Sequence, residues 1–326
     1  MVASIIIPSW NGLKHLRKCL PSISSQTLRG VEVIVVDNGS EDSSVSYIKK
    51  SFPKFKVIEL SENLGFAKAV NLGIKESHGK YIILINNDTK LQEKAIEYLV
   101  KAANNHPEIG FVASKMLNFF KSGVINAVGG YIDAVGHANN LGMGVKDTKR
   151  FNKAGYVFIA TGGGGLFKRE VFDKVGLFDE DYFAYMEDVD LCFRAQLAGF
   201  KGWYEPKAII YHVHKATSSR NPAFLEYLQF RNMTMTVIKN FPRNLLLRDW
   251  NWFKAFLVNI NTVRFLASEG YLLSALKAEW YILTNIRKLL QKRKKIQNSK
   301  KVPDQYIIEN ILPKKITFFG FLKPGI

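Results

Sequence analysis

The segment Tyr81-Ile82-Ile83-Leu84-Ile85-Asn86-Asn87-Asp88-Thr89 places five apolar residues directly before two amides, a carboxylate and a hydroxyl. An apolar run without polar alternation is typical of a strand that is covered on both faces, as in a parallel sheet flanked by helices. Polar side chains that follow such a strand lie at its carboxyl end, where open α/β sheets bind their ligands. The segment therefore predicts a buried strand that delivers polar groups to a ligand site.

The residues on either side of this segment repeat the same pattern. Three further apolar, β-branched runs occur at Ser4–Ile7, Val31–Val36 and Lys56–Leu60. Stretches with helical periodicity separate these runs, at Leu13–Ser24, Ser43–Phe52, Ala67–Ser77 and Gln92–Asn104. Strands that alternate with helices predict an α/β fold: a Rossmann-like, mostly parallel sheet with helices on both faces.

The remaining chain is less regular. Residues 110–165 are rich in glycine and carry weak strand signals, so we predict no order of elements there. Helices are expected at 171–175 and 186–198, a strand at 208–213, and a long helix from Pro222 to about Asn240, ended by Phe241-Pro242. We expect one catalytic domain over residues 1–240 and a basic, aromatic-rich helical region over residues 241–326.

The composition limits the class of protein. The 326 residues are 47% hydrophobic, enough to bury a sizeable core, and their net charge of +18 with a pI near 9.7 indicates an anionic partner. The two cysteines lie far apart, which argues against a disulfide scaffold or a thiolate zinc site and fits a reducing compartment. The first residues do not resemble a signal peptide, and no charge-free apolar run reaches the ~18 residues of a membrane span.

Much of the positive charge lies near the C-terminus. Residues 239–301 hold 14 Lys and Arg against three acidic residues, a net +11. An apolar stripe at helical spacing begins at Trp250 and continues through Trp280 to Leu283. Aromatic residues beside basic runs predict an amphipathic helical hairpin at an anionic membrane surface. The alternative is a helical region that packs its stripe on the catalytic core or on a second copy, as in a homodimer.

Two further clusters follow or precede predicted elements. The segment Val35-Val36-Asp37-Asn38-Gly39-Ser40 places polar groups at a strand end, where they suit a base N–H and ribose hydroxyls. Taken alone, a plain Asx turn is the better explanation of this cluster. Asn63-Leu64-Gly65-Phe66-Ala67, with Asn71, opens a helix whose amides suit a phosphate or a nucleobase, unless it is an ordinary helix cap.

Other residues suggest a metal and a proton acceptor. The oxygens of Asn86, Asn87 and Asp88 suit a divalent cation. His212 or His214, which share one strand face, could complete a site with Asp88. Acidic residues crowd between Asp179 and Asp190, where a metal, a cationic partner, helix capping or proton transfer would account for them. The run Thr161-Gly162-Gly163-Gly164-Gly165 allows a ligand to approach the backbone closely, but it is neither a Walker loop nor a dinucleotide fingerprint.

The order and spacing of these motifs over residues 3–235 closely resemble family 2 glycosyltransferases of the GT-A fold, and within them the rhamnosyltransferase-like branch. The series runs from Ile5–Asn11 through Val35–Ser40, Asn63–Ala67 and Leu84–Thr89 to Gly176–Glu180, Glu187–Leu191 and Tyr211-His212.

The resemblance implies roles for single residues, and these complete the set of expected site residues. Pro8, Trp10 and Asn11 line the nucleotide pocket, Asp37 with Asn38 holds the pyrimidine, and Asn63, Gly65, Phe66 and Asn71 border the nucleoside. Asn87 and Asp88 correspond to the DxD segment, and His212 matches a metal-ligating histidine. Gly163 and Gly164 lie near donor sugar or acceptor. Asp188 matches the catalytic base, with Glu187 beside it. The chain departs from the pattern at Asn86, an amide where DxD has its first acid. His214 lies two residues after His212, so either histidine could be the metal ligand.

The resemblance also implies an activity: inverting transfer of a sugar from dTDP-rhamnose or a UDP-hexose to a glycan or polyprenyl-linked acceptor in cell-surface polysaccharide synthesis. It implies an Mn²⁺ or Mg²⁺ cofactor, no nucleic acid, and a cytoplasmic enzyme at the inner face of the cell membrane. A non-catalytic protein that binds nucleic acid or anionic membranes is the alternative, because it would explain the charge. A sugar-nucleotide pyrophosphorylase fits less well, since Pro8-Ser9-Trp10-Asn11 stands where its glycine-rich loop would be.

Overall fold

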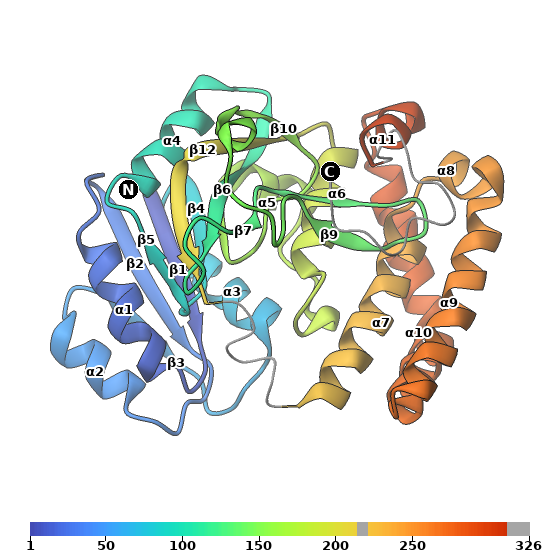
Figure 1. The fold of residues 1–326 in the computed structure, drawn as a ribbon, viewed down its shortest axis with the longest axis horizontal. Helices are drawn as coiled ribbons and strands as arrows, with labels where there is room; N and C mark the ends of the chain where they lie inside the picture. Colours follow the sequence, from blue (N-terminus) through green and yellow to red (C-terminus); the bar gives the residue numbers. More distant parts are fainter. Residues whose placement is uncertain (214–220, 312–326) are drawn as a thin grey trace.

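The computed structural model describes residues 1–213 and 221–311 and shows a central sheet with helices on both sides and a group of helices at one end (Figure 1). The strands are β1 (Ala3–Ser9), β2 (Val31–Asp37), β3 (Lys56–Glu59), β4 (Tyr81–Ile85), β5 (Thr89–Leu91), β6 (Ile109–Asn118), β7 (Ile125–Ala127), β8 (Gly130–Ile132), β9 (Ala138–Asn140), β10 (Gly155–Val157), β11 (Gly164–Lys168) and β12 (Lys201–His212). The helices are α1 (Leu13–Ser24), α2 (Ser44–Ser51), α3 (Phe66–Lys75), α4 (Ala95–Asn105), α5 (Arg169–Val175), α6 (Glu187–Leu197), α7 (Pro222–Asn240), α8 (Arg243–Leu247), α9 (Asn251–Ser268), α10 (Leu272–Asn298) and α11 (Asp304–Ile311).

The main sheet has the strand order β10-β12-β6-β11-β4-β1-β2-β3. Strands β3, β2, β1 and β4 are parallel, as the alternation of strands and helices predicted. In the register of β1 and β2, Ser9 lies beside Asp37, so both strands end at one edge of the sheet. The other long parallel pair is β6 and β12, and β11 runs antiparallel between β4 and β6.

The sheet is mostly parallel, as predicted, and what the sequence left without a predicted order lies in residues 110–165. Strand β6 is buried, but the charge of Lys115 interrupts its apolar run, and Asp147 compensates that charge at 3.0 Å. Strand β11 begins with two glycines, which have no side chain to show a hydrophobic pattern. Both strands gain their stability from burial within the sheet rather than from local preference.

Alternate residues of β1 show how the sheet is covered. Ile5 and Ile7 pack with apolar residues of α1 and α4 on one face, whereas Ile6 packs with those of α3 and α6 on the other. All three side chains are at most 1% exposed. The uninterrupted apolar runs thus arise because both faces of the strands are buried, as the sequence indicated.

The C-terminal helices lie at the end of the molecule opposite α1 and α2 (Figure 1). Helix α10 packs along α7 and against α9, so the predicted helical hairpin is present. Phe241, Leu245 and Ile307 belong to the same buried cluster as residues of the sheet. The domain boundary after residue 240 stays a prediction, and His214 lies outside the described residues.

Candidate active site

Three polar clusters that are distant in sequence meet at the carboxyl edge of the parallel strands. The backbone N–H of Asn38 donates to the carbonyl of Ser9 at 2.7 Å, and the side-chain amide of Asn87 donates to the Ser9 hydroxyl at 2.9 Å. Ser9, at the end of β1, therefore joins the segment after β2 to the segment after β4.

The glycine run connects this edge to the proposed catalytic base. The backbone N–H of Asn86 donates to the carbonyl of Gly163 at 3.1 Å. The N–H of Gly162 donates to Oδ2 of Asp188 at 2.8 Å. A Cβ atom at Gly163 would lie 2.6 Å from the side-chain nitrogen of Asn86, so a larger residue there would displace that side chain. Asp88 and Asp188 are thereby placed at the same edge of the sheet.

Asp37 has one oxygen available for a ligand. Its side chain is 2% exposed, and Oδ2 accepts from the N–H of Ser40 at 3.0 Å. Oδ1 is buried and has no hydrogen-bond partner within the described residues. A buried acceptor without a donor costs about 1–3 kcal/mol, and an N–H group of a ligand would remove that cost. This arrangement fits the expected contact with a pyrimidine base.

Some of the predicted nucleoside contacts hold the protein itself together. Asn38 accepts from the N–H of Leu64 at 2.9 Å and donates to Asn63 at 2.9 Å. Asn71 donates to the carbonyl of Phe178 at 2.9 Å and accepts from its N–H at 3.0 Å. The side-chain amides of Asn38 and Asn71 therefore hydrogen-bond neighbouring loops of the protein, which is the structural role expected of asparagine in turns.

Other predicted residues shape the turns around the edge. Asn11, with φ of +49°, accepts from the N–H of Glu41 at 2.8 Å and so ties the turn after β1 to the segment after β2. Gly65 has φ of +85°, and a Cβ there would lie 2.6 Å from the ring of Phe183. The ring of Phe66 lies beside Gly162, 3.3 Å from where a Cβ of that glycine would be.

The remaining predicted residues lie at the ends of the strands. Pro8 is the last residue but one of β1, and Trp10 follows that strand directly. Gly164 is the first residue of β11 and pairs with Ile85 of β4. All three are therefore at the same edge as Ser9 and Asp37.

Asp88 and His212 form the predicted metal pair. Strands β5 and β12 pair with Thr89 beside His212, and this register brings Oδ1 of Asp88 to 3.4 Å from Nε2 of His212. Burial raises the pKa of Asp88, but the hydrogen bond and charge of His212 outweigh it and lower that pKa. A carboxylate and an imidazole suit Mn²⁺, and Mg²⁺ would rely mainly on the carboxylate. No group of three possible ligands occurs within residues 1–213 and 221–311, so the diphosphate of a donor would have to supply oxygens.

Glu187 and Asp188 begin α6. Burial raises the pKa of Asp188, while the N–H groups of Gly162 and Val189 act in the opposite direction. Burial, and then the charge of Asp188, raise the pKa of Glu187 well above its usual value, and Oε2 of Glu187 is buried without a partner in the described chain. Burial thus disfavours the charged form of Glu187 more strongly than that of Asp188, whose carboxylate accepts backbone hydrogen bonds.

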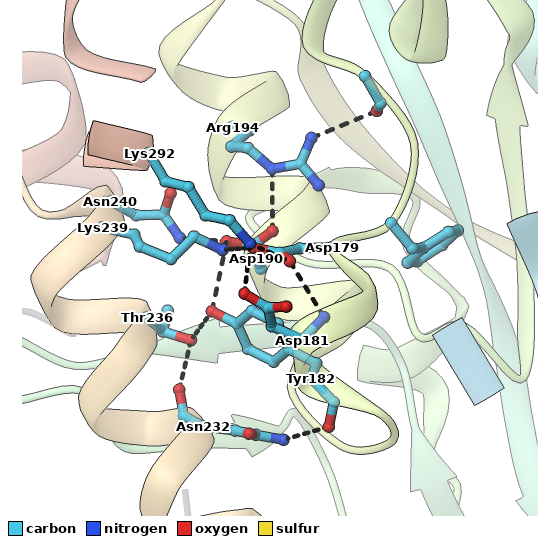
Figure 2. Close-up of polar contacts among 12 residues, drawn as sticks. Asp179, Asp181, Tyr182, Asp190, Arg194, Asn232, Thr236, Lys239, Asn240 and Lys292 are labelled. Atoms are coloured by element: carbon cyan, nitrogen blue, oxygen red, sulfur yellow. Dashed lines mark hydrogen bonds and ion pairs between the residues drawn. The ribbon is translucent and has the colours of Figure 1, made fainter. Parts of the chain in front are cut away.

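The other acids of this segment have structural partners. Asp190 is fully buried and contacts Arg194 at 2.9 Å and Lys239 at 2.8 Å. Asp179 and Asp181 contact Lys292 of α10 at 2.5 and 2.7 Å (Figure 2). Of the explanations for the acidic crowding, a cationic partner applies to these three residues, and the cations belong to the chain's own helices α6, α7 and α10. No local pattern pointed to Lys239 or Lys292 as partners, because these ion pairs join residues far apart in the chain.

Comparisons with known proteins identify the family. The family model described as Glycosyl transferase family 2 matches residues 4–176. The chain is 29% identical over 248 residues to the N-acetylglucosaminyl-diphospho-decaprenol L-rhamnosyltransferase of Mycobacterium tuberculosis, covering 68% of this chain and 79% of that protein. It is 26% identical over 208 residues to the poly-beta-1,6-N-acetyl-D-glucosamine synthase of Staphylococcus epidermidis, covering 63% of this chain and 48% of the synthase.

Solved structures agree on the fold. The structure of GalNAc-T7 with UDP, GalNAc and Mn²⁺ superposes with a TM-score of 0.60 at 16% identity, covering 74% of this chain and 48% of that one. Residues 1–349 of TarS from S. aureus superpose with a TM-score of 0.53 at 16% identity, covering 92% of this chain and 91% of that one. The fold is that of the GT-A glycosyltransferases, and the family match covers more than half of the sequence. The chain is a glycosyltransferase and belongs to glycosyl transferase family 2.

Proposed function

We propose that this enzyme transfers a sugar, with inversion, from dTDP-rhamnose or a UDP-hexose to a hydroxyl group of a polyprenyl-linked glycan during cell-surface polysaccharide synthesis. The observation that carries the proposal is the position of Asp188. Its carboxylate is fixed by Gly162 at the sheet edge where Asp37 has an unpartnered oxygen and Asp88 contacts His212. The edge thus combines Asp37 for the nucleobase, Asp88 with His212 for a cation on the diphosphate, and Asp188 for the proton of the acceptor.

In the proposed reaction Asp188 accepts the proton of the acceptor hydroxyl. The oxygen of that hydroxyl forms a bond to the anomeric carbon of the donor, and the bond between this carbon and the diphosphate oxygen breaks on the opposite face. The raised pKa of Asp188 makes its carboxylate a better proton acceptor than an exposed one. A divalent cation held by Asp88 and His212 would supply positive charge to the departing diphosphate.

The donor is held from two sides in this proposal. Asp37 accepts from an N–H of the pyrimidine, which both uracil and thymine provide, so this contact does not distinguish UDP from dTDP. The glycines at the start of β11 let the sugar approach the backbone beside Asp188. The relative from M. tuberculosis, whose name specifies L-rhamnosyl transfer, favours dTDP-rhamnose among the donors.

The acceptor side of the proposal rests on the C-terminal helices. Trp252 and Phe256 of α9 are 47% and 55% exposed, and Trp280 and Leu283 of α10 are 68% and 65% exposed. No helix within the described residues is long and apolar enough to span a bilayer. Exposed aromatic residues in a segment with a net charge of +11 suit the surface of an anionic membrane. The enzyme would act there at the inner, cytoplasmic face, where nucleotide sugars are available.

The alternative of a non-catalytic nucleic-acid-binding protein has less support. Lys239, Lys288 and Lys292 all contact carboxylates of residues 179–190, so part of the basic surplus is neutralised within the protein. The alternative to a membrane is that a second copy of the chain covers the exposed apolar side chains of α9 and α10.

A thermal-shift screen of nucleoside diphosphates with and without Mn²⁺ or Mg²⁺ tests the donor part. We expect UDP or dTDP to raise the melting temperature in a cation-dependent manner, whereas ADP does not, because a ligand stabilises the folded state in proportion to its binding. The sugar of the stabilising nucleotide is then supplied with a polyprenyl-diphosphate-linked N-acetylglucosamine, and the product is analysed by mass spectrometry. Stabilisation by no pyrimidine nucleotide, or by every nucleotide equally, would contradict the proposal.

A further inference from the structure

The turn that leads into the catalytic helix α6 has an unusual backbone. Phe183, Tyr185 and Met186 have φ angles of +63°, +68° and +66°, and Met186 directly precedes Glu187. Side-chain-bearing residues rarely adopt this left-handed region, and each such residue costs on the order of 1 kcal/mol. Three of them in four positions persist only if the surrounding structure holds them. The same turn determines where Asp188 lies.

Helix α7 holds the backbone of this turn. The side-chain amide of Asn232 donates to the carbonyls of Tyr182, Ala184 and Tyr185 at 3.0, 2.9 and 2.7 Å. The neighbouring Arg231 donates to the carbonyls of Asp181 and Tyr182 at 2.8 and 3.0 Å. Asn232 is fully buried and Arg231 is 6% exposed. The carbonyls of the turn therefore find their donors on a helix of the C-terminal part of the chain.

Helix α10 holds the side chains that precede the turn. Nζ of Lys292 donates to Asp179 at 2.5 Å and to Asp181 at 2.7 Å, while Lys239 of α7 contacts Asp179 at 2.5 Å (Figure 2). Burial lowers the pKa of Lys292, but its hydrogen bonds to Asp179 and Asp181 outweigh burial and raise that pKa. Lys292 is thus a cation that bridges the carboxylates of Asp179 and Asp181.

We propose that Lys292 is a positioning residue for Asp188, and that α10 therefore belongs to the catalytic unit. Lys292 touches neither donor nor acceptor in this proposal. It neutralises Asp179 and Asp181, which keeps the segment before α6 folded onto α7. The strained turn then presents Asp188 to the amide of Gly162. Without Lys292, among the described residues Asp179 retains only Lys239 as a cationic partner and Asp181 only Lys288, so no cation there bridges the two carboxylates. The turn then relaxes, and the carboxylate of Asp188 loses its fixed geometry.

The proposal predicts a change in turnover but not in nucleotide binding, because the donor's contacts come from the ends of β1, β2 and β4. We expect Lys292→Met to lower kcat about tenfold or more, since small displacements of a catalytic group are costly. The dissociation constant of the nucleoside diphosphate should stay within about twofold of wild type. Lys292→Arg should restore most of kcat, because arginine keeps the charge and the donors.

The matched control is Lys294→Met. Lys294 lies on the same helix, is exposed, and forms no ion pair within the described residues, so this variant removes the same charge without affecting the turn. Asp181→Asn should reproduce the loss of kcat, and the double variant Asp181→Asn/Lys292→Met should be no worse than Lys292→Met alone, because both changes break one interaction.

Hydrogen exchange supplies a readout that does not need activity, which matters because the proposal depends on the proposed role of Asp188. Amides of residues 183–188 should exchange faster in Lys292→Met than in Lys294→Met, while those of β1 and β4 should not change. The proposal is wrong if the two variants have equal kcat and equal exchange, or if Lys292→Met loosens the whole sheet. If wild type transfers no sugar but the exchange difference is present, the proposed function fails and the positioning of the turn by Lys292 stands.

Discussion

Oδ2 of Asp188 accepts a hydrogen bond from the backbone N–H of Gly162 at 2.8 Å. This contact joins the start of α6 to the glycine run before β11, and the glycine run in turn lies against the end of β4 through the bond between Asn86 and Gly163. The proposed base and the DxD segment are therefore fixed relative to each other through the backbone rather than through flexible side chains. Such rigidity is what proton transfer to a positioned carboxylate requires.

The two acids at the start of α6 should respond differently to neutralisation. Asp188→Asn should lower kcat about 10²–10⁴-fold while nucleotide binding persists, because the amide cannot accept the proton. Glu187→Gln should retain at least about a tenth of the wild-type kcat, because burial already disfavours the charged form of Glu187 and the amide has a similar shape. Steady-state kinetics with both variants check this, and comparable turnover of Asp188→Asn and wild type would show that the base is another group.

Removal of either proposed metal ligand should abolish the effect of the cation. In Asp88→Asn and His212→Ala, Mn²⁺ should no longer add to the melting-temperature increase produced by UDP or dTDP. His78→Ala is the control, because His78 is an exposed histidine whose ring lies near Glu32 rather than Asp88. A cation effect that survives both substitutions would place the metal elsewhere.

Asp190→Asn should be strongly destabilising. The carboxylate is fully buried between Lys239 and Arg194, and removing one partner of a buried ion pair leaves uncompensated charge, at a cost of about 3–5 kcal/mol. Urea unfolding measures the loss. Asp249→Asn, at an exposed position, should change the unfolding free energy by less than about 0.5 kcal/mol. Equal effects of the two substitutions would mean that the buried network contributes little.

The ion pairs of Asp181 should make the protein sensitive to acid. Burial raises the pKa of this carboxyl group, but Lys288 and Lys292 outweigh it, so the folded-state pKa lies below the ordinary value of 3.8. The unfolded chain then binds a proton at a higher pH than the folded chain does. The resulting stabilisation is present above about pH 4 and is lost as the pH falls toward the folded-state pKa. Denaturation series from pH 6 to 2.5 should show a shallower decline for Asp181→Asn than for wild type, and parallel curves would contradict this linkage.

The exposed apolar side chains of α9 and α10 should bind anionic lipid. Full-length protein should sediment with phosphatidylglycerol vesicles but much less with phosphatidylcholine vesicles, and high salt should weaken the binding. Trp252→Glu and Trp280→Glu should each reduce the bound fraction, whereas Phe120→Glu, at a side chain that is 72% exposed after β6, should not. Binding that is unaffected by the tryptophan substitutions would refute the membrane proposal. A change from dimer to monomer in Trp280→Glu would instead show that a second copy covers these side chains.

The sequence alone was sufficient to predict the parallel strands β1 to β4 and the edge where polar residues follow them. Strands such as β4 are buried on both faces, so their apolar runs are visible locally, and the amides and carboxylates that follow them mark the edge. The order of these motifs also sufficed for the family, which the family model confirms. Antiparallel β11 escaped prediction because glycines carry no hydrophobic pattern.

Only the tertiary structure revealed which groups the acids between Asp179 and Asp190 contact. Asp179, Asp188 and Asp190 look alike along the chain, yet Asp188 meets the amide of Gly162 while the other two meet lysines of α7 and α10. Local sequence sets helix and strand preferences through interactions between near neighbours. The charge partners of a carboxylate depend on which distant helices pack against it, and that is decided when the whole chain folds.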